Sequence, residues 1–435
     1  MFKRTALKRL NDWRFSTNRK PLVLRGARQV GKTTLIQEFA QSFAQKIMLN
    51  LEKVEHKQML EASKPFSEIL NRLFFQFNIP QNNLPTLLFI DEIQNSPKTV
   101  ALLRFFYEEA PWLYVIAAGS LLEFALQELP SFGVGRIRSL FVRPFSFNEF
   151  LLACNQNQLA EAIQNASETN PLPDLIHKKI ITSYKRFMAI GGMPEVVASY
   201  AATNDMLLCM NIIDDLVISY QDDFAKYKRL MPANRIKEAF EATVMQMGGK
   251  FVYSKAALTS DPKQIKAAIE LLILAGLVIP VTHTSSNGIP LGAEIDTKKR
   301  KMLIFDTGVF QRLLGLNIGE LMIGDSFEVI NKGALAELSV GLELSKLSAF
   351  YRNEPLYYWQ RESVSGNAEI DYVFQKGEKI IPIEVKSSTK GSMQSLHQFM
   401  KEKKSEEGIR FSLENFGRYQ NIRTIPLYAV SLINQ

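Results

Sequence analysis

Cysteine is nearly missing from this chain, and so are the apolar runs that would hold it in a membrane. Only 2 of the 435 residues are cysteine, Cys154 and Cys209, and their spacing matches neither a disulfide framework nor a metal-binding motif. No uninterrupted apolar stretch reaches the roughly 18 residues that indicate a transmembrane helix. The N-terminus, "MFKRTALKRLNDW", has basic residues but lacks the apolar centre of a signal peptide. We therefore expect a cytoplasmic protein with reduced structural thiols and no membrane partner.

The charge balance is basic but not extreme. The chain has 52 Lys and Arg residues against 44 Asp and Glu residues, which gives a formal net charge of +8. This excess favours approach to polyanions such as DNA, and a solubilising surface is the alternative interpretation. Hydrophobic residues at 46% and charged residues at 22% are typical of a soluble globular protein. The length predicts two or three domains.

The order of the predicted elements divides the chain into four parts. Residues 1–150 alternate β-rich runs such as "PLVLR" and "TLLFI" with helical stretches, which predicts an α/β fold with a parallel sheet. Residues 151–204 are predicted to form a helical lid or linker. Residues 205–315 have helices followed by two strands, the order of a winged helix. Residues 316–435 begin with the helix "KGALAELSVGLELSKL" and continue with three strands, which predicts a second α/β domain.

A phosphate-binding loop is predicted at residues 26–34, "GARQVGKTT". This segment satisfies G-x-x-x-x-G-K-[ST] and lies between a predicted strand and a predicted helix. Its glycines allow the backbone to curl, so that N–H groups and the helix N-terminus face phosphate oxygens. Lys32 would reach the β and γ phosphates of ATP, and the Thr33 hydroxyl would bind Mg²⁺. The predicted cofactor-binding residues of the loop are Gly26, Ala27, Arg28, Gln29, Val30, Gly31, Lys32, Thr33 and Thr34.

A second predicted strand, in "TLLFIDEIQ", carries two carboxylates where it ends. Ligands collect at the carboxyl ends of strands in open α/β sheets. Asp91 is therefore predicted to support the Mg²⁺ ion, and Glu92 to orient the attacking water as the catalytic base. Acidic residues after a strand are also common as helix N-caps, but the presence of the phosphate loop favours the catalytic interpretation.

Three further polar residues are candidates for contact with the γ-phosphate. Ser120 ends "VIAAGS" and would hydrogen-bond the phosphate or the attacking water, whereas a plain helix N-cap explains it equally well. Arg136 and Arg138 follow a glycine turn in "FGVGRIRS", and either would offer a positive charge to the phosphate of a neighbouring subunit. A solvated basic loop is the alternative. A role in a neighbouring subunit would require a homo-oligomer.

At this point five segments together resemble the bacterial and archaeal AAA+ ATPases that carry a C-terminal domain of unknown function: "RGARQVGKTTL", "LLFIDEIQ", "AAGSLLE", "GVGRIRSLFVRPFSFNEFL" and "GGMPEVV". The resemblance runs over nearly the whole chain. It implies an AAA+ core, a winged-helix segment and a C-terminal region of restriction-endonuclease-like fold. It also implies roles for Lys32 and Thr33 in the phosphate loop, Asp91 and Glu92 in the second motif, Ser120 as sensor and Arg136 as arginine finger. The "SLL" after Gly119 departs from relatives, which often have a second small polar residue there.

Nuclease-like folds of this class place an Asp and a Glu-x-Lys on adjacent strands around one or two divalent metals. The matching residues here are Asp371 in "AEIDYVF" and Glu384 with Lys386 in "IPIEVKS". Asp371 and Glu384, with Lys386, are the predicted second divalent-metal site. Glu337, on the preceding helix, would add an acidic ligand.

The register of one hairpin decides whether these residues meet. "KGEK" at 376–379 offers a two-residue Gly-X turn, typical of type II′, that would pair Lys376 with Lys379. In that register Asp371 lies opposite Glu384, and facing carboxylates repel unless a cation or proton lies between them. A hairpin whose polar face is only solvated is the alternative. The same register predicts an apolar face made of Ile370, Tyr372, Phe374, Ile381, Ile383 and Val385.

These predictions lead to three functional hypotheses. The first, which we favour, is a Mg²⁺-dependent ATPase whose nucleotide cycle moves a DNA-binding C-terminal half. The second is a metal-dependent nuclease gated by that ATPase. The third is a non-catalytic, nucleotide-dependent interaction switch, in which the end domain is only a binding module.

Overall fold

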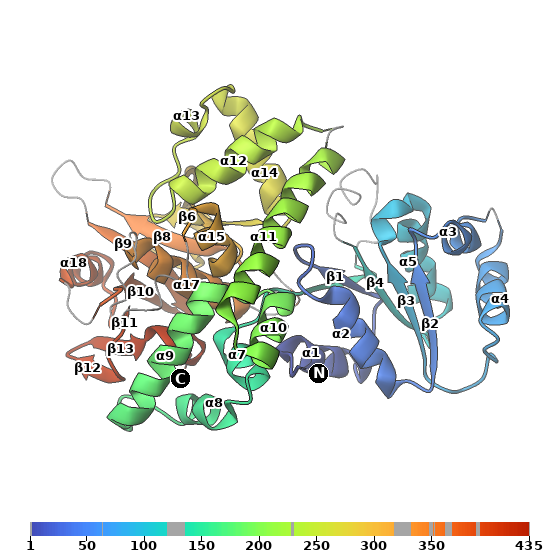
Figure 1. Ribbon diagram of the computed structural model, residues 1–435, viewed down its shortest axis with the longest axis horizontal. Helices are drawn as coiled ribbons and strands as arrows, with labels where there is room; N and C mark the ends of the chain where they lie inside the picture. The colour runs from blue at the N-terminus through green and yellow to red at the C-terminus, as the bar shows by residue number, and fades with distance from the viewer. Residues whose placement is uncertain are drawn as a thin grey trace. The chain divides into compact units, whose positions relative to one another are not determined.

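A computed structural model of the chain describes residues 2–62, 64–119, 135–227, 230–316, 332–347, 351, 353–361, 368–388 and 392–434 (Figure 1). The chain divides into two compact units, which are described separately below. The first contains residues 3–143 together with residues 351 and 353, and the second contains residues 144–347 and the residues from 354 onward. Among the described helices, none combines the length and the apolar character needed to cross a bilayer.

The first unit is built on a five-stranded parallel sheet in the order β2-β3-β4-β1-β5. Its strands are β1 (Leu22–Arg25), β2 (Gln45–Asn50), β3 (Thr86–Asp91), β4 (Tyr114–Ala118) and β5 (Arg138–Phe141). β1 and β3 are almost entirely buried, as expected for parallel strands that are covered on both faces. Because all five strands run the same way, the segments that follow β1 and β3 lie at one edge of the sheet. The predicted parallel α/β sheet is confirmed.

Helices cover both faces of this sheet. On one face, α3, α4 and α5 pack their apolar side chains against alternate residues of β1, β2, β3 and β4. On the other face, Trp13 of α1 and Phe39 of α2 belong to an aromatic cluster that includes Tyr114 of β4. The helices of this unit are α1 (Thr5–Arg14), α2 (Lys32–Phe39), α3 (Val54–Glu61), α4 (Phe66–Gln76) and α5 (Pro97–Glu109), with the 3-10 turns η1 (Ala40–Ser42) and η2 (Ile93–Asn95).

The second unit contains an eight-stranded mixed sheet in the order β12-β13-β11-β10-β9-β8-β6-β7. Its strands are β6 (Val278–Thr284), β7 (Ile295–Ile304), β8 (Leu356–Gln360), β9 (Glu369–Lys376), β10 (Lys379–Val385), β11 (Gly408–Ser412), β12 (Gly417–Tyr419) and β13 (Ile422–Pro426). β6 and β7 are the two strands expected to form a wing. Because β6 pairs with β8, the sheet runs across the boundary expected near residue 315.

The helices of the second unit surround this sheet, and three of them, α12 to α14, precede β6 and β7 in the predicted order. α18 packs Leu396 and Phe399 onto one face of the sheet. α17 approaches the other face so closely that a Cβ on Gly341 would lie 2.3 Å from the Tyr372 hydroxyl. The elements are α7 (Phe147–Ala153), α8 (Asn157–Gln164), α9 (Asp174–Ile190), α10 (Pro194–Thr203), α11 (Met206–Asp223), η3 (Phe224–Tyr227), α12 (Ala233–Met245), α13 (Tyr253–Ala256), α14 (Pro262–Leu274), η4 (Leu291–Glu294), α15 (Thr307–Leu313), α17 (Lys332–Leu347), α18 (Gln394–Lys403) and η5 (Leu427–Leu432).

The β9–β10 hairpin has the predicted register. Lys376 pairs with Lys379, and the pairing continues in step to Tyr372 and Ile383. Gly377 has a φ of 60°, which is the left-handed conformation that a type II′ turn requires at its first central residue. The next pair in this register is Asp371 with Glu384, so the two carboxylates lie at the same end of the hairpin.

One part of the hairpin prediction is wrong, because β9 contains a bulge. Against β8 the register shifts by one residue between Tyr357 and Trp359, so that β9 has one extra residue at this point. Ile370 therefore joins Val373 in the apolar cluster under α18. Tyr372 points the other way and donates a hydrogen bond to a backbone carbonyl of α17 at 2.8 Å. Ile370 and Tyr372 do not share a face, since a bulge interrupts the alternation of side chains along a strand.

The segments "PFSFNEFL" and "GGMPEVV" contact each other inside the second unit. The Phe145 N–H donates to the Gly192 carbonyl at 2.7 Å, and a Cβ on Gly192 would lie only 2.4 Å from the Phe145 carbonyl oxygen. The buried Asp306 carboxylate accepts a hydrogen bond from the Gly192 N–H at 2.7 Å and caps α15 through the Gly308 N–H. These segments are therefore packing contacts, and glycine is required at 192 because a side chain would collide with backbone.

Candidate nucleotide site and buried charge cluster

The predicted phosphate loop joins β1 to α2 in the first unit. Gln29 and Gly31 have φ values of 61° and 86°, and both are therefore in the left-handed conformation. Glycine adopts this conformation without strain, whereas other residues adopt it uncommonly. Gly26 also has a positive φ, and a Cβ there would lie 2.1 Å from the Val142 carbonyl oxygen. Gly26 is therefore needed for a close backbone contact with the segment after β5, as well as for the curl of the loop.

Lys32 lies inside this loop. Its side chain is buried, and Nζ donates hydrogen bonds to the carbonyl oxygens of Gly26 at 2.9 Å and Ala27 at 2.7 Å. Burial lowers the pKa of Lys32 to about 8, although the Glu92 and Asp91 carboxylates act in the opposite direction. Burying an ammonium group costs free energy, so contact with an anion stabilises a buried lysine strongly.

The carboxylates at the end of β3 lie where the sequence predicted them. The Thr33 hydroxyl donates a hydrogen bond to Asp91 Oδ2 at 2.8 Å, which joins the loop to β3. Burial raises the pKa of Asp91, while the hydrogen bond from Thr33 opposes that shift. A hydroxyl and a carboxylate are the oxygen ligands that Mg²⁺ takes from proteins when phosphates and water supply the rest. These residues therefore suit a magnesium-bound nucleotide.

Glu92 adopts a left-handed backbone conformation, with a φ of 53°, directly after β3. Its carboxylate accepts a hydrogen bond from the side-chain amide of Gln94. Sequence analysis did not identify Gln94. Its signal is its place two residues after Glu92 in "IDEIQ", where a short 3-10 turn brings the amide back toward the carboxylate.

The remaining residues predicted near the γ-phosphate are Ser120, Arg136 and Arg138. Ser120 lies outside the described residues. Arg136 forms an ion pair with Glu108 at the end of α5, and the guanidinium of Arg138 lies 4.9 Å from the centre of the Tyr351 ring. Both arginines thus have partners within their own unit, and the role of Arg136 as an arginine finger stays a prediction.

The C-terminal carboxylates surround a buried lysine that sequence analysis did not identify. Lys301, on β7, is 1% exposed, and its Nζ lies 2.9 Å from Glu337 Oε1, 2.5 Å from Glu369 Oε1 and 3.9 Å from Asp371 Oδ1. Burial alone would lower the pKa of Lys301, but the three carboxylates together raise it. In the sequence Lys301 is the last basic residue of "KKRK", and nothing in that run distinguishes it from its less buried neighbours.

Glu384 and Lys386 form a second ion pair beside this cluster, with 2.5 Å between Glu384 Oε1 and Lys386 Nζ. Asp371 Oδ2 accepts a hydrogen bond from the Val385 N–H at 2.7 Å, which ties β9 to β10. Burial raises the pKa of both Asp371 and Glu384. The structure therefore brings Asp371, Glu384 and Lys386 together, and their part in any reaction stays a prediction.

The predicted second divalent metal does not fit these residues. Within the described part of the chain, no three or more His, Cys, Asp and Glu side chains are grouped so that they could hold a metal ion. The Lys301 ammonium lies where Glu337, Glu369 and Asp371 converge, and it would repel a divalent cation there. Of the two facing carboxylates, Asp371 lies near the Lys301 ammonium and Glu384 pairs with Lys386, so each has a positive charge of the protein beside it.

Three family models match successive parts of the chain. Residues 18–151 match an AAA domain. Residues 181–319 and residues 332–430 match two domains of unknown function, DUF8612 and DUF4143. No functionally curated protein matches the chain. Together with the loop geometry, the first match identifies residues 18–151 as an AAA-type P-loop ATPase domain.

The solved structures similar to this chain are distant. A Walker-type ATPase of Pyrococcus abyssi is 15% identical, with a TM-score of 0.46, over 72% of this chain and 96% of that one. The ORC1 protein of Aeropyrum pernix in complex with DNA is 12% identical, with a TM-score of 0.28, over 73% of this chain and 93% of that one. The Drosophila ORC bound to DNA is 13% identical, with a TM-score of 0.28, over 71% and 94%. At these scores the structures carry no argument about this chain.

Binding of magnesium-ATP is expected to take up about one proton per site at pH 9 and almost none at pH 7. The pKa of Lys32 in the free protein is about 8. Phosphate favours the ammonium form and so raises that pKa in the complex. Between the two pKa values the free lysine is neutral and the bound lysine is charged, so binding takes up a proton. Titration calorimetry in buffers with different ionisation enthalpies would measure this uptake.

The matched control for this experiment is Lys32→Arg. Arginine stays charged at pH 9, so the variant is expected to show no uptake even if it binds ATP more weakly. An uptake that is equal in both proteins would mean that another group takes the proton.

Proposed function

We propose that this chain is a Mg²⁺-dependent ATPase whose nucleotide cycle acts on a C-terminal half that binds DNA. The observation that carries the ATPase part is the junction between the phosphate loop and β3. There, buried Lys32 lies within the loop and the Thr33 hydroxyl lies 2.8 Å from the Asp91 carboxylate. This arrangement supports the nucleotide-binding roles predicted for the loop.

Nucleotide binding would exchange protein contacts for phosphate contacts. The N–H groups at the start of α2 and the Lys32 ammonium would bind the β and γ phosphates, so that Lys32 leaves the carbonyls of Gly26 and Ala27. Thr33 and Asp91 would hold the magnesium ion that arrives with ATP. The ion supplies charge neutralisation on the β and γ phosphates.

Hydrolysis would then depend on Glu92. Its carboxylate would orient a water in line with the γ-phosphate and accept the proton that the water loses as the new P–O bond forms. The bond between the γ-phosphorus and the bridging oxygen breaks in the same displacement, and that oxygen leaves with ADP. The hydrogen bond from Gln94 supports a fixed orientation of that carboxylate. Gln94 is therefore a positioning residue in this proposal. For Arg136 to act on a neighbouring subunit, it would have to leave Glu108, and the protein would have to be a homo-oligomer.

The DNA-binding part of the proposal rests on the segment expected to be a winged helix. Exposed lysines lie on three elements of that segment: Lys255 on α13, Lys263 and Lys266 on α14, and Lys298 on β7. In a helix-turn-helix variant the last helix enters the major groove and the flanking elements contact the backbone. The position of these lysines, together with the net charge of +8, supports contact with DNA phosphates.

Replacing both Lys263 and Lys266 by glutamate is expected to weaken DNA binding at least 10-fold. Each lost phosphate contact lowers the slope of log K against log salt by about 0.9. The double variant should therefore lose about 2 units of slope. Fluorescence anisotropy of a labelled DNA duplex between about 50 and 200 mM salt would measure both effects.

The matched control is Lys178→Glu with Lys179→Glu, which makes the same charge change at two exposed positions of α9. This variant is expected to bind DNA almost as the unaltered protein does. Equal losses in the two variants would indicate only a net-charge effect, and an unaffected Lys263→Glu, Lys266→Glu variant would contradict DNA binding through α14. A protein that binds no DNA but hydrolyses ATP would favour the interaction switch.

The gated nuclease is not favoured by the buried charge cluster. A nuclease of the predicted class needs a divalent metal between Asp371 and Glu384, and the Lys301 ammonium lies 3.9 Å from the first of these carboxylates instead. We therefore derive no cleavage step from Asp371, Glu384 and Lys386.

A further inference from the structure

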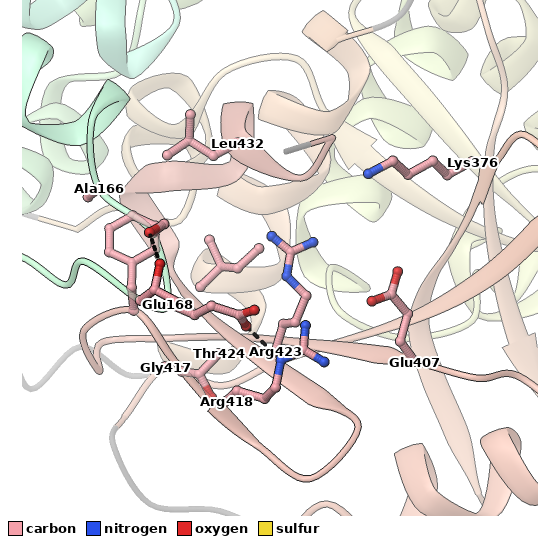
Figure 2. A pocket seen from close by; sticks show the side chains of 13 residues that line it. Ala166, Glu168, Lys376, Glu407, Gly417, Arg418, Arg423, Thr424 and Leu432 are labelled. Carbon is pink, nitrogen blue, oxygen red and sulfur yellow. Dashed lines mark hydrogen bonds and ion pairs between the residues drawn. The ribbon is translucent and has the colours of Figure 1, made fainter.

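A pocket of about 270 Å³ lies in the second unit, away from the buried lysine cluster, and no function described above uses it. It lies between the β12–β13 hairpin and the loop that connects α8 to α9 (Figure 2). Its charged lining residues are Glu168, Lys376, Glu407, Arg418 and Arg423. Figure 2 shows Glu168 on one side of the two arginines, and Lys376 and Glu407 on the other.

The two arginines are directly opposed across the hairpin. Arg418 on β12 pairs with Arg423 on β13, so both side chains project from the same face of the sheet. Like charges at such positions are destabilising by several tenths of a kcal/mol to about 1 kcal/mol. An anion between the two guanidinium groups would remove that repulsion.

The protein itself places one carboxylate against this pair of arginines. Glu168 Oε2 accepts a hydrogen bond from Arg418 Nε at 2.8 Å. Among the described residues, the Arg423 side chain makes no hydrogen bond or ion pair of its own. Each guanidinium has five N–H donors, so most of the donors of this pair are available to a ligand.

The wall of the pocket is held in place by contacts outside it. The side chain of Asn415, just before β12, accepts a hydrogen bond from the Leu172 N–H at 3.3 Å and donates one to the Leu172 carbonyl at 2.6 Å. These bonds tie the α8–α9 loop to the strand region that carries the arginines. On the far side, Lys376 Nζ donates to the Asn434 carbonyl at 2.8 Å. The charged side chains therefore project from backbone segments that these hydrogen bonds hold in place.

We propose that this pocket binds the phosphate monoester group of a small ligand about the size of a mononucleotide. The terminal oxygens of a phosphate monoester can accept hydrogen bonds from two guanidinium groups at once, which a single carboxylate does less completely. Lys376 adds a third positive charge from β9. The hydroxyls of Ser167, Thr169 and Thr424 and the apolar side chains of Phe416, Ile425 and Leu432 line the space that would hold the rest of the ligand.

A small ligand fits better than a nucleic-acid strand. The pocket volume of about 270 Å³ is just below the range of small-molecule sites. The carboxylates of Glu168 and Glu407 lie on opposite sides of the arginines, where the next phosphates of a strand would pass. They would repel a continuing polyanion more strongly than a single phosphate, although Glu168 competes with that phosphate for Arg418.

Calorimetry on the full-length Lys32→Ala protein would test the proposal, because that change removes phosphate binding at the loop. The probes are inorganic phosphate, adenosine 5′-monophosphate, adenosine and a single-stranded oligonucleotide. We expect the monophosphate to bind more tightly than phosphate, and adenosine not to bind. Arg423→Met should weaken monophosphate binding at least 10-fold, and Arg423→Lys less.

Lys379→Met is the matched control, because it removes an exposed cation next to Lys376 that does not line the pocket, and it should leave binding unchanged. Arg423 makes no hydrogen bond or ion pair among the described residues, and its loss removes the repulsion with Arg418, so the melting temperature should not fall; an unlowered melting temperature confirms folding. Three results would overturn the proposal: no binding of either phosphate probe, equal binding of adenosine, or monophosphate binding that Arg423→Met does not change. Oligonucleotide binding that is tighter than monophosphate binding and is lost in Arg423→Met would assign the pocket to a nucleic-acid strand instead.

Discussion

Replacing Glu92 by Gln is expected to lower ATP turnover by about 10²- to 10⁴-fold, which is the usual contribution of a general base. Glutamine keeps the shape of the side chain but cannot accept the proton of the attacking water. ATP binding should stay within a few-fold of the unaltered protein, because Lys32, Thr33 and Asp91 are untouched. Phosphate release and equilibrium binding of ATP, measured on the same preparation, would separate the two effects.

Two further variants test the other residues that contact the nucleotide or Glu92. Lys32→Ala is expected to lose ATP binding and turnover together, because it removes the cation that contacts the phosphates. Gln94→Ala removes only the hydrogen bond to the Glu92 carboxylate and should lower turnover by roughly 10-fold with ATP affinity unchanged. Normal hydrolysis by Glu92→Gln would show that Glu92 is not the base.

Replacing Lys301 by Met is expected to destabilise the second unit by about 3–5 kcal/mol, because it leaves buried carboxylates without their cation. Glu337 is most affected, since it is 7% exposed and lies 2.9 Å from the lysine ammonium. Urea denaturation of the variant and the unaltered protein would measure the difference in free energy of unfolding.

The loss should be larger at pH 8 than at pH 6. Burial raises the pKa of Glu337 to about 7, and the Lys301 ammonium acts to lower it. Without that ammonium the pKa of Glu337 rises further. A carboxyl whose pKa is higher in the folded than in the unfolded protein binds more protons when folded, so stability falls as the pH rises through the folded-state pKa. Each unit of added pKa shift corresponds to about 1.4 kcal/mol.

Two controls make this prediction specific to the buried charge. Lys298→Met makes the same change at an exposed position of β7 and should alter stability by less than about 0.5 kcal/mol. Adding Glu337→Gln to Lys301→Met should recover much of the loss, because the unpaired charge is then removed as well. A loss that is equal at pH 6 and pH 8 would indicate a packing defect and would contradict the charge argument.

The features predicted correctly are those that depend on short stretches of sequence. The phosphate loop, the carboxylate pair after β3 and the β9–β10 register each follow from residues that lie within about ten positions of one another. The bulge in β9 was missed because it depends on how β9 pairs with β8, and no turn residue in "AEIDYVF" marks it. The pairing of β6 with β8 was not predicted for a similar reason, since it joins residues more than 70 positions apart.

By itself, the sequence determined the parallel α/β fold of the first unit, the position of its nucleotide-binding loop and the meeting of Asp371 with Glu384. It also showed that facing carboxylates need a positive charge. Only the tertiary structure decided that Lys301 supplies a positive charge to Asp371, because the order of the eight-stranded sheet and the packing of α17 bring β7 to Glu337 and Asp371. The energy of a buried charge depends on its neighbours in space, and these are set by sheet order rather than by nearness in the chain.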